Sequence, residues 1–171
     1  MDLRMLAERA LKACGDAPQA EVFAASGRTV SVYLDDGRIK NVEEKEDLGV
    51  SVRVLKGRRL GQASSTCATI EDAERCARAA LRLADLAPAS KSFDRLPSPS
   101  KATLAPNNWD PAVAQLDGSA LGELTSAVAG AAEDRGVKVP KGMVRGGAVE
   151  TLVRNTNGVD AENRYTLVFS D

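Results

Sequence analysis

The sequence predicts an α+β fold in which an antiparallel β meander packs against helices. Three observations indicate it: a hydrophobic period of two over residues 20–64, an Asp36-Gly37 hairpin signal, and helical stripes on both sides of the strands. The 171 residues suffice for one ordinary domain or two small ones, with a buried core. Aromatic residues make up only 4%, so that core must be built from alanine, valine and leucine.

The first half of the chain is predicted as one helix, a meander and a second helix. Residues 2–14 form an amphipathic stripe that Asp2 can cap and Gly15 can end. Strands are expected at 20–26, 29–34, 38–45, 48–55 and 59–64, with turns at Gly27, Asp36-Gly37, Asp47 and Lys56-Gly57. Thr69 and Asp72 then resemble a capping box, which predicts a helix from about Ile70 that covers the apolar face of the sheet.

The second half begins with an extended connector. Five of the seven prolines lie from Pro88 to Pro111, where no hydrophobic period is present, and Trp109 is expected to pin the connector to the body. A helix follows from about Asp117 to Gly136, and two strands at 143–154 and 159–169 are joined by an Asn-Gly hairpin turn. The expected stripe of that helix consists of Leu121, Leu124, Val128 and Ala131.

Three parts are therefore expected: an N-terminal unit at 1–88, the connector at 89–116, and a second helix-plus-strands unit at 117–171. The two units have the same order of helix, strands and hairpin, so an internal duplication and two generic units both remain open. The apolar run Tyr165–Phe169 lies two residues before the last residue and would leave an unprotected strand edge. We therefore expect the chain to be the front part of a longer protein with a C-terminal domain.

Composition and charge exclude several function classes. The net charge of −1 lacks the basic footprint of a nucleic-acid-binding domain. No apolar run approaches the length of a membrane span, and the first residues do not resemble a signal peptide, so a cytoplasmic location is expected. The sequence has no histidine, and its three cysteines (Cys14, Cys67 and Cys76) lack zinc-type spacing, so we expect reduced thiols and no metal site.

Three local features of the sequence are candidate sites. Ser65 or Cys67 could be a nucleophile at the strand-to-helix turn, but without a histidine base we favour strand-ending and helix-capping roles. The acidic run 43–47 is interpreted as a solvated hairpin loop, and the basic run 56–59 as a solvated turn. The predicted set of catalytic, cofactor-binding and metal-binding residues is therefore empty.

Two stretches resemble a known family. They read AEVFAASGRTVSVYLDDGRIKNVEEKEDLGVSVRVLKGRRLGQASST and IEDAERCARAALRLADLAP. Together they are similar to the N-terminal domain of the TldD/PmbA family of metalloprotease-related proteins, known in part as candidate modulators of DNA gyrase. The resemblance covers about residues 20–88 well and 117–171 more loosely. The segment 61–66 looks closer to the PmbA (TldE) branch than to the TldD branch.

The resemblance implies a non-catalytic N-terminal domain of a peptidase subunit. Family members form homodimers or TldD–PmbA heterodimers in the cytoplasm and enclose a chamber where unfolded peptides are cleaved. The family's zinc motif, His-Glu-x-x-x-His, belongs to a later part of the polypeptide or to a partner subunit. On this basis the chain would wall the chamber and help assembly, and an exposed strand edge at 29–34 or 48–55 could pair with a peptide.

Two rival functions stay open at this point. The first rival is a free-standing binding or assembly module without peptidase activity. The second is a small hydrolase that uses Ser65 or Cys67, which would require turnover by the chain alone. The sequence does not predict the peptide substrate, and its charge balance gives no independent support to a link with DNA gyrase.

Overall fold

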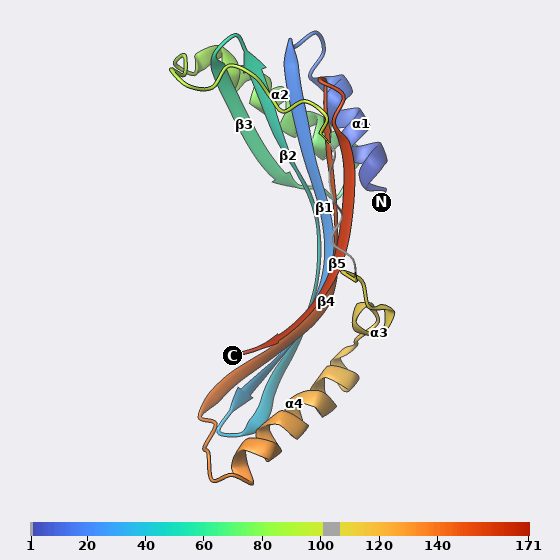
Figure 1. Ribbon diagram of the computed structural model, residues 1–171, viewed down its shortest axis with the longest axis vertical. Helices are drawn as coiled ribbons and strands as arrows, with labels where there is room; N and C mark the ends of the chain where they lie inside the picture. The colour runs from blue at the N-terminus through green and yellow to red at the C-terminus, as the bar shows by residue number, and fades with distance from the viewer. Residues whose placement is uncertain (1, 101–106) are drawn as a thin grey trace. The chain divides into compact units, whose positions relative to one another are not determined.

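The computed structural model describes residues 2–100 and 107–171 (Figure 1). It confirms an α+β fold with one five-stranded antiparallel sheet and packed helices. The strand order is β3-β2-β1-β4-β5. The elements in chain order are α1 (Leu3–Ala13), β1 (Gln19–Asp35), β2 (Arg38–Lys56), β3 (Arg59–Thr66), α2 (Ile70–Leu86), α3 (Pro111–Ala114), α4 (Gly118–Glu133), β4 (Lys141–Asn155) and β5 (Asp160–Ser170).

The first two strands are longer than the sequence predicted. The expected turns at Gly27 and Asp47 are wrong, because β1 and β2 run through them without interruption. Neither residue has a positive φ, whereas Asp36 (φ 50°) and Gly37 (φ 71°) form the predicted hairpin turn. A Cβ at Gly27 would lie 3.4 Å from a methyl carbon of Val149, an ordinary van der Waals contact, so neither a turn nor close packing requires glycine at this position of β1.

The chain forms two compact units from interleaved segments. Among the described residues, unit 1 comprises 2–26, 47–100 and 150–163, and unit 2 comprises 27–46, 107–149 and 164–171. The long strands β1, β2, β4 and β5 each contribute residues to both units. The units therefore do not follow the chain-order boundaries expected at 88 and 116, because one strand can serve two cores along its length.

The core of unit 1 lies between one face of the sheet and the helices α1 and α2 (Figure 1). Asp2 caps α1, and the predicted capping box of Thr69 and Asp72 is present at the start of α2. The buried side chains are small, which lets the helices approach the strands closely. They include Ala20, Val22 and Ala24 of β1, Val50, Val52 and Val54 of β2, and Ala73, Ala77, Ala80 and Ala84 of α2.

Unit 2 has a smaller core, built by Val30, Val32, Leu121 and Val144. The predicted stripe of α4 is only partly right, because Leu124 and Val128 are 42% and 46% exposed. The helix buries Thr125 and Ala129 instead. The Thr125 hydroxyl donates to the carbonyl oxygen of Leu121 at 2.7 Å, so this polar side chain can be buried without losing a hydrogen bond.

The connector contains one element that the sequence did not predict. Asp110 caps the short helix α3 by accepting from the backbone nitrogens of Ala112 and Val113. Nearby, the Arg164 guanidinium lies 4.8 Å from the ring centre of Trp109, which holds this half-buried tryptophan within unit 2. The part of the predicted connector at 101–106 lies outside the described residues.

Candidate binding site on the open face of the sheet

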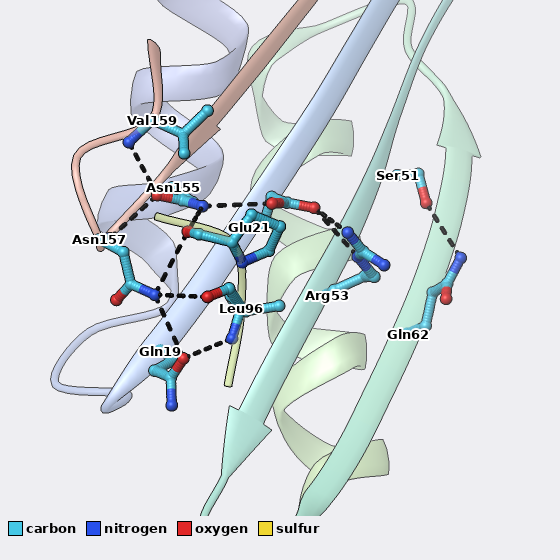
Figure 2. A network of polar contacts seen from close by, with 10 residues as sticks. Gln19, Glu21, Ser51, Arg53, Gln62, Leu96, Asn155, Asn157 and Val159 are labelled. Atoms are coloured by element: carbon cyan, nitrogen blue, oxygen red, sulfur yellow. Dashed lines mark hydrogen bonds and ion pairs between the residues drawn. The ribbon is translucent and has the colours of Figure 1, made fainter. Parts of the chain in front are cut away.

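The candidate site lies in unit 1, on the face of the sheet opposite the helices (Figure 2). Successive side chains of a strand point to opposite faces, so Glu21 and Phe23 lie opposite Ala20, Val22 and Ala24. A hollow of about 420 Å³ is present there, within the usual range of ligand pockets of about 300–1,000 Å³. Its lining residues are Glu21, Phe23, Ser51, Arg53, Gln62, Pro97, Val153 and Val159.

A buried ion pair forms the polar floor of the hollow. The Glu21 side chain is 6% exposed, and its Oε1 accepts from Arg53 Nε at 3.1 Å and from Arg53 Nη2. Its second oxygen, Oε2, accepts from Asn155 Nδ2 at 3.2 Å. Both carboxylate oxygens of Glu21 therefore have hydrogen-bond donors, and the Arg53 guanidinium balances the carboxylate in charge.

A segment of the connector, residues 94–97, lies beside the hollow and contributes Pro97 to its lining. Figure 2 shows Leu96 of this segment between Gln19 and Asn157. The backbone nitrogen of Leu96 donates to Gln19 Oε1 at 2.6 Å, and the Leu96 carbonyl oxygen accepts from Asn157 Nδ2 at 3.0 Å. Asn155 Nδ2 donates to the carbonyl oxygen of Pro97 at 2.9 Å. Side-chain amides therefore hold this segment through its backbone, while the Leu96 side chain is 1% exposed.

The opposite wall comes from β2 and β3. Arg53 faces Gln62 in the strand register, and Ser51 faces Ser64. Ser51 Oγ accepts from Ser64 Oγ at 3.0 Å and from Gln62 Nε2 at 3.4 Å. This wall offers mainly hydrogen-bond donors, because the N–H groups of the Arg53 guanidinium and the Gln62 amide outnumber the acceptor oxygens of the wall. The arrangement can bind an acceptor group, and it contains no paired nucleophile and base.

The structure does not bring Ser65 and Cys67 into a nucleophilic site. Ser65 faces the buried Val50 across the ladder, and its hydroxyl donates to the Thr66 carbonyl oxygen at 2.8 Å. Cys67 is 5% exposed, and burial raises the pKa of its thiol. Ser65 lies near the end of β3, as the sequence predicted, and Cys67 packs in the core of unit 1. The predicted helix-capping role of these residues is wrong, because Thr69 is the N-cap of α2.

The acidic run 43–47 is not the solvated loop that the sequence predicted. It lies within β2, where Glu43 accepts from the Tyr33 hydroxyl at 3.2 Å and Glu44 pairs with Arg28 at 2.5 Å. These carboxylates are exposed but they contact the neighbouring strand, because β2 continues through the predicted turn.

The basic run 56–59 contains an exposed turn at residues 57–58, as the sequence predicted, but its cationic side chains have partners. Arg58 donates to the carbonyl oxygens of Ser90 (2.6 Å) and Lys91. Lys56 pairs with Asp85 at 2.7 Å. The cationic side chains fasten the connector and the end of α2 to the sheet, so they are not available as a phosphate-binding patch.

Neither strand segment proposed to pair with a peptide is an edge. Residues 29–34 belong to β1, which lies between β2 and β4 in the sheet. Residues 48–55 belong to β2, which lies between β3 and β1 and pairs with β3 along this segment. The backbone groups of these segments are therefore used by neighbouring strands. In the sheet order, β3 and β5 are the terminal strands.

The residues do not fit a zinc site. The sequence has no histidine, and among residues 2–100 and 107–171 no three Cys, Asp or Glu side chains cluster closely enough to hold a metal ion. Cys14, Cys67 and Cys76 are free and buried. No helix in the described part of the chain is long and apolar enough to cross a membrane.

The sequence did not predict the hollow, because no motif marks it. The available signal was one charged residue inside each of two apolar strands: Glu21 between Ala20 and Val22, and Arg53 between Val52 and Val54. Alternation places both on the face away from the core. Their pairing, and the contribution of Asn155 from a distant hairpin, required the tertiary structure.

Comparison with known proteins finds one family model that matches part of the chain and several solved structures with a similar fold. Residues 20–84 match the model of PmbA/TldA metallopeptidase domain 1. No curated protein sequence matches the chain. The fold is similar to TldE from Thermococcus kodakarensis, with a TM-score of 0.77 and 18% identity over 96% of this chain and 38% of that one.

Two further crystal structures have the same fold. A candidate modulator of a DNA gyrase from Thermotoga maritima has a TM-score of 0.76 and 18% identity, covering 99% of this chain and 39% of that one. A candidate modulator of DNA gyrase from Bacteroides thetaiotaomicron has a TM-score of 0.79 and 16% identity, covering 98% of this chain and 39% of that one. The chain thus spans about two fifths of the length of the proteins whose structures it matches.

Proposed function

We propose that this chain, which carries an N-terminal domain of the TldD/PmbA family, serves as the non-catalytic part of a metallopeptidase subunit that processes or degrades peptides. The observation that carries the proposal is the combination of the family match at residues 20–84 with a fold that covers 96–99% of this chain but only 38–39% of its structural neighbours. In this proposal the chemistry belongs to the remaining part of the polypeptide or to a partner.

The domain's role is assembly and enclosure of a chamber. The partner is a second copy or a TldD/PmbA homologue, the substrate is an unfolded peptide, and the complex works in the cytoplasm without direct contact to nucleic acid or membrane. The PmbA (TldE) branch is the preferred one, in which a subunit without the zinc motif completes the complex. The residues of this chain support the non-catalytic role, since the hollow on the open face offers hydrogen-bond donors and apolar contacts but no nucleophile–base pair.

The test begins with the native polypeptide, tagged and purified from its own cells. We expect a mass well above that of 171 residues and co-purification with a homologue that carries the His-Glu-x-x-x-His motif. The purified complex should contain zinc and hydrolyse an unfolded peptide, and removing the zinc with a chelator should abolish hydrolysis. A native polypeptide that ends at Asp171 and has no such partner would overturn the proposal in favour of a free-standing binding module.

A second measurement separates the small-hydrolase alternative. Peptide and ester turnover by the chain alone should be absent, and Ser65→Ala and Cys67→Ala should leave the activity of the complex unchanged. Turnover by the isolated chain that either substitution removes would contradict the non-catalytic role.

A further inference from the structure

We infer that the hollow on the open face of unit 1 binds an extended, uncharged peptide segment, with one apolar side chain in the hollow and a backbone carbonyl on Arg53. This site lies entirely within the described residues of unit 1 and needs no peptidase partner. It adds a peptide-binding surface that the proposed assembly role does not require.

The first argument is that this face already binds a peptide segment, namely residues 94–97 of the same chain. Gln19 and Asn157 satisfy the backbone nitrogen and the carbonyl oxygen of Leu96, and the Leu96 side chain is buried. Hydrogen bonds from side-chain amides to backbone groups recognise the backbone of an extended segment and do not depend on its sequence. The hollow continues along the same face from Pro97, so it offers a second segment the same kind of surface.

The second argument is the charge balance of the hollow. Among the described residues that line it, Arg53 is the one basic residue and Glu21 the one acidic residue, and the two pair with each other. A ligand carboxylate would therefore gain little net attraction and would lie near the Glu21 carboxylate. A ligand ammonium would find both Glu21 oxygens already taken by Arg53 and Asn155. The neutral floor thus favours a ligand without formal charge.

The third argument is the distribution of hydrogen-bonding groups. Arg53 donates to Glu21 through Nε and Nη2, so among the described residues Nη1 has no hydrogen-bond partner, and the side chain is 37% exposed. Gln62 lies opposite Arg53 and has only a 3.4 Å contact with Ser51. These exposed N–H groups can donate to a ligand in place of water, and a peptide carbonyl is an uncharged acceptor that an extended chain presents at every residue.

The fourth argument is that the apolar residues lining the hollow favour one apolar side chain of the bound peptide. Phe23 is 42% exposed although it lies on a strand that is otherwise well buried in unit 1. Val153, Val159 and Pro97 lie around the same hollow. Its volume of about 420 Å³ accommodates a leucine-sized side chain together with its flanking backbone.

The experiment is a titration of the isotope-labelled chain with a blocked pentapeptide, acetyl-Ala-Ala-Leu-Ala-Ala-amide, followed by NMR of the Val153 and Val159 methyl groups. We expect saturable shifts of these methyls. Replacing the peptide leucine with serine should weaken binding at least about fivefold, because the apolar contact is lost. Binding that is equal for both peptides, or absent at millimolar peptide, would overturn the inference.

Charge variants of the probe test the occupant's chemistry. The same peptide with a free C-terminal carboxylate should bind no better than the blocked one. Tighter binding of the free acid would contradict the inference and would identify the site as a carboxylate pocket on Arg53. Self-association of the chain with the same methyl shifts, seen by sedimentation, would show instead that a second copy occupies the hollow, and this would also contradict it.

Two substitutions in β3 provide a matched pair. Gln62 and Thr66 lie on the same strand and face, but only Gln62 lines the hollow. Gln62→Ala should weaken binding about fivefold by removing one hydrogen-bond donor, whereas Thr66→Ala should leave it unchanged. A third variant, Val153→Trp, fills the hollow without touching the ion pair and should abolish binding. Unchanged affinity in both Gln62→Ala and Val153→Trp would overturn the assignment.

Discussion

Gly61 of β3 and Ala84 of α2 meet backbone to backbone: a Cβ added to Gly61 would lie 2.2 Å from the backbone nitrogen of Ala84. It would also lie 2.1 Å from the carbonyl oxygen of Ala80. No side-chain movement can relieve these contacts, because backbone atoms form them. The alanine stripe of α2 and this glycine together set how closely the helix approaches the sheet.

Gly61→Ala should therefore lower the free energy of unfolding by about 1–3 kcal/mol or more, since overpacking a core usually costs this much. The free energy of unfolding from urea titration measures it. Gly130→Ala is the matched control, since Gly130 lies inside α4 with nothing within 4 Å of the added Cβ. That substitution should stabilise the chain by about 0.5–1 kcal/mol through helix propensity. A neutral Gly61→Ala variant would contradict the close approach of α2.

The ion pair between Glu21 and Arg53 should show strong coupling in a double-mutant cycle. Arg53→Met leaves the Glu21 carboxylate, 6% exposed, with only Asn155 as a donor. We expect a loss of a few kcal/mol, below the roughly 3–5 kcal/mol of fully buried pairs because Arg53 is 37% exposed.

The double variant Glu21→Met, Arg53→Met should be more stable than Arg53→Met alone, because no unpaired charge remains. Unfolding in urea compares the four proteins of the cycle. If the stability losses of the two single variants add up to the loss of the double variant, the two side chains do not interact in one buried site.

Cys14 should make the stability of the chain decrease at alkaline pH. Burial, and then the nearby Cys76, raises the pKa of the Cys14 thiol from 9.0 to about 11. As pH rises, the unfolded chain therefore loses this proton before the folded chain does. The contribution of the Cys14 thiol to the free energy of unfolding is complete below pH 9 and is lost as pH rises through about 11. The total loss is on the order of 2–3 kcal/mol.

Urea titrations between pH 8 and 11 measure this slope, with Cys14→Ala as the comparison. The variant should be less stable at pH 8 but should lose less stability over the pH range. Equal slopes in the two proteins would show that Cys14 is not protected from ionisation in the folded state.

The segment 94–97 should be released when its side-chain clamps are removed. Gln19→Ala removes the acceptor of the Leu96 amide, and Asn157→Ala removes the donor to its carbonyl oxygen. Both variants should show faster hydrogen exchange at Leu96 and faster tryptic cleavage after Arg95, which is exposed in the folded chain.

Asn163→Ala is the control for these two variants, because Asn163 is an exposed asparagine on β5 outside the clamp. It should leave both rates unchanged. Equal cleavage rates in Gln19→Ala, Asn157→Ala and the unmodified chain would show that the buried Leu96 side chain alone holds the segment.

The sequence by itself determined the elements that depend on local signals. The Asp36-Gly37 turn follows from the positive φ that this hairpin needs, and the capping box of Thr69 and Asp72 fixes where α2 begins. The period of two across 20–64 was enough for the α+β fold class, and the resemblance of residues 20–88 agrees with the family model that matches residues 20–84. The internal duplication, the oligomeric state and the peptide substrate stay predictions.

Only the tertiary structure decided where strands continue and which polar side chains meet. Nothing local distinguishes Gly27 and Asp47 in long strands from the same residues in turns, because the neighbouring strands decide whether the ladder continues. The buried face of α4 runs through Leu121, Thr125 and Ala129, and Leu124 and Val128 stay half exposed. Burial of Thr125 is possible because its hydroxyl donates to a carbonyl oxygen within its own helix. The hollow joins Glu21, Arg53 and Asn155, residues up to 134 positions apart, and such contacts exist only after the sheet has assembled.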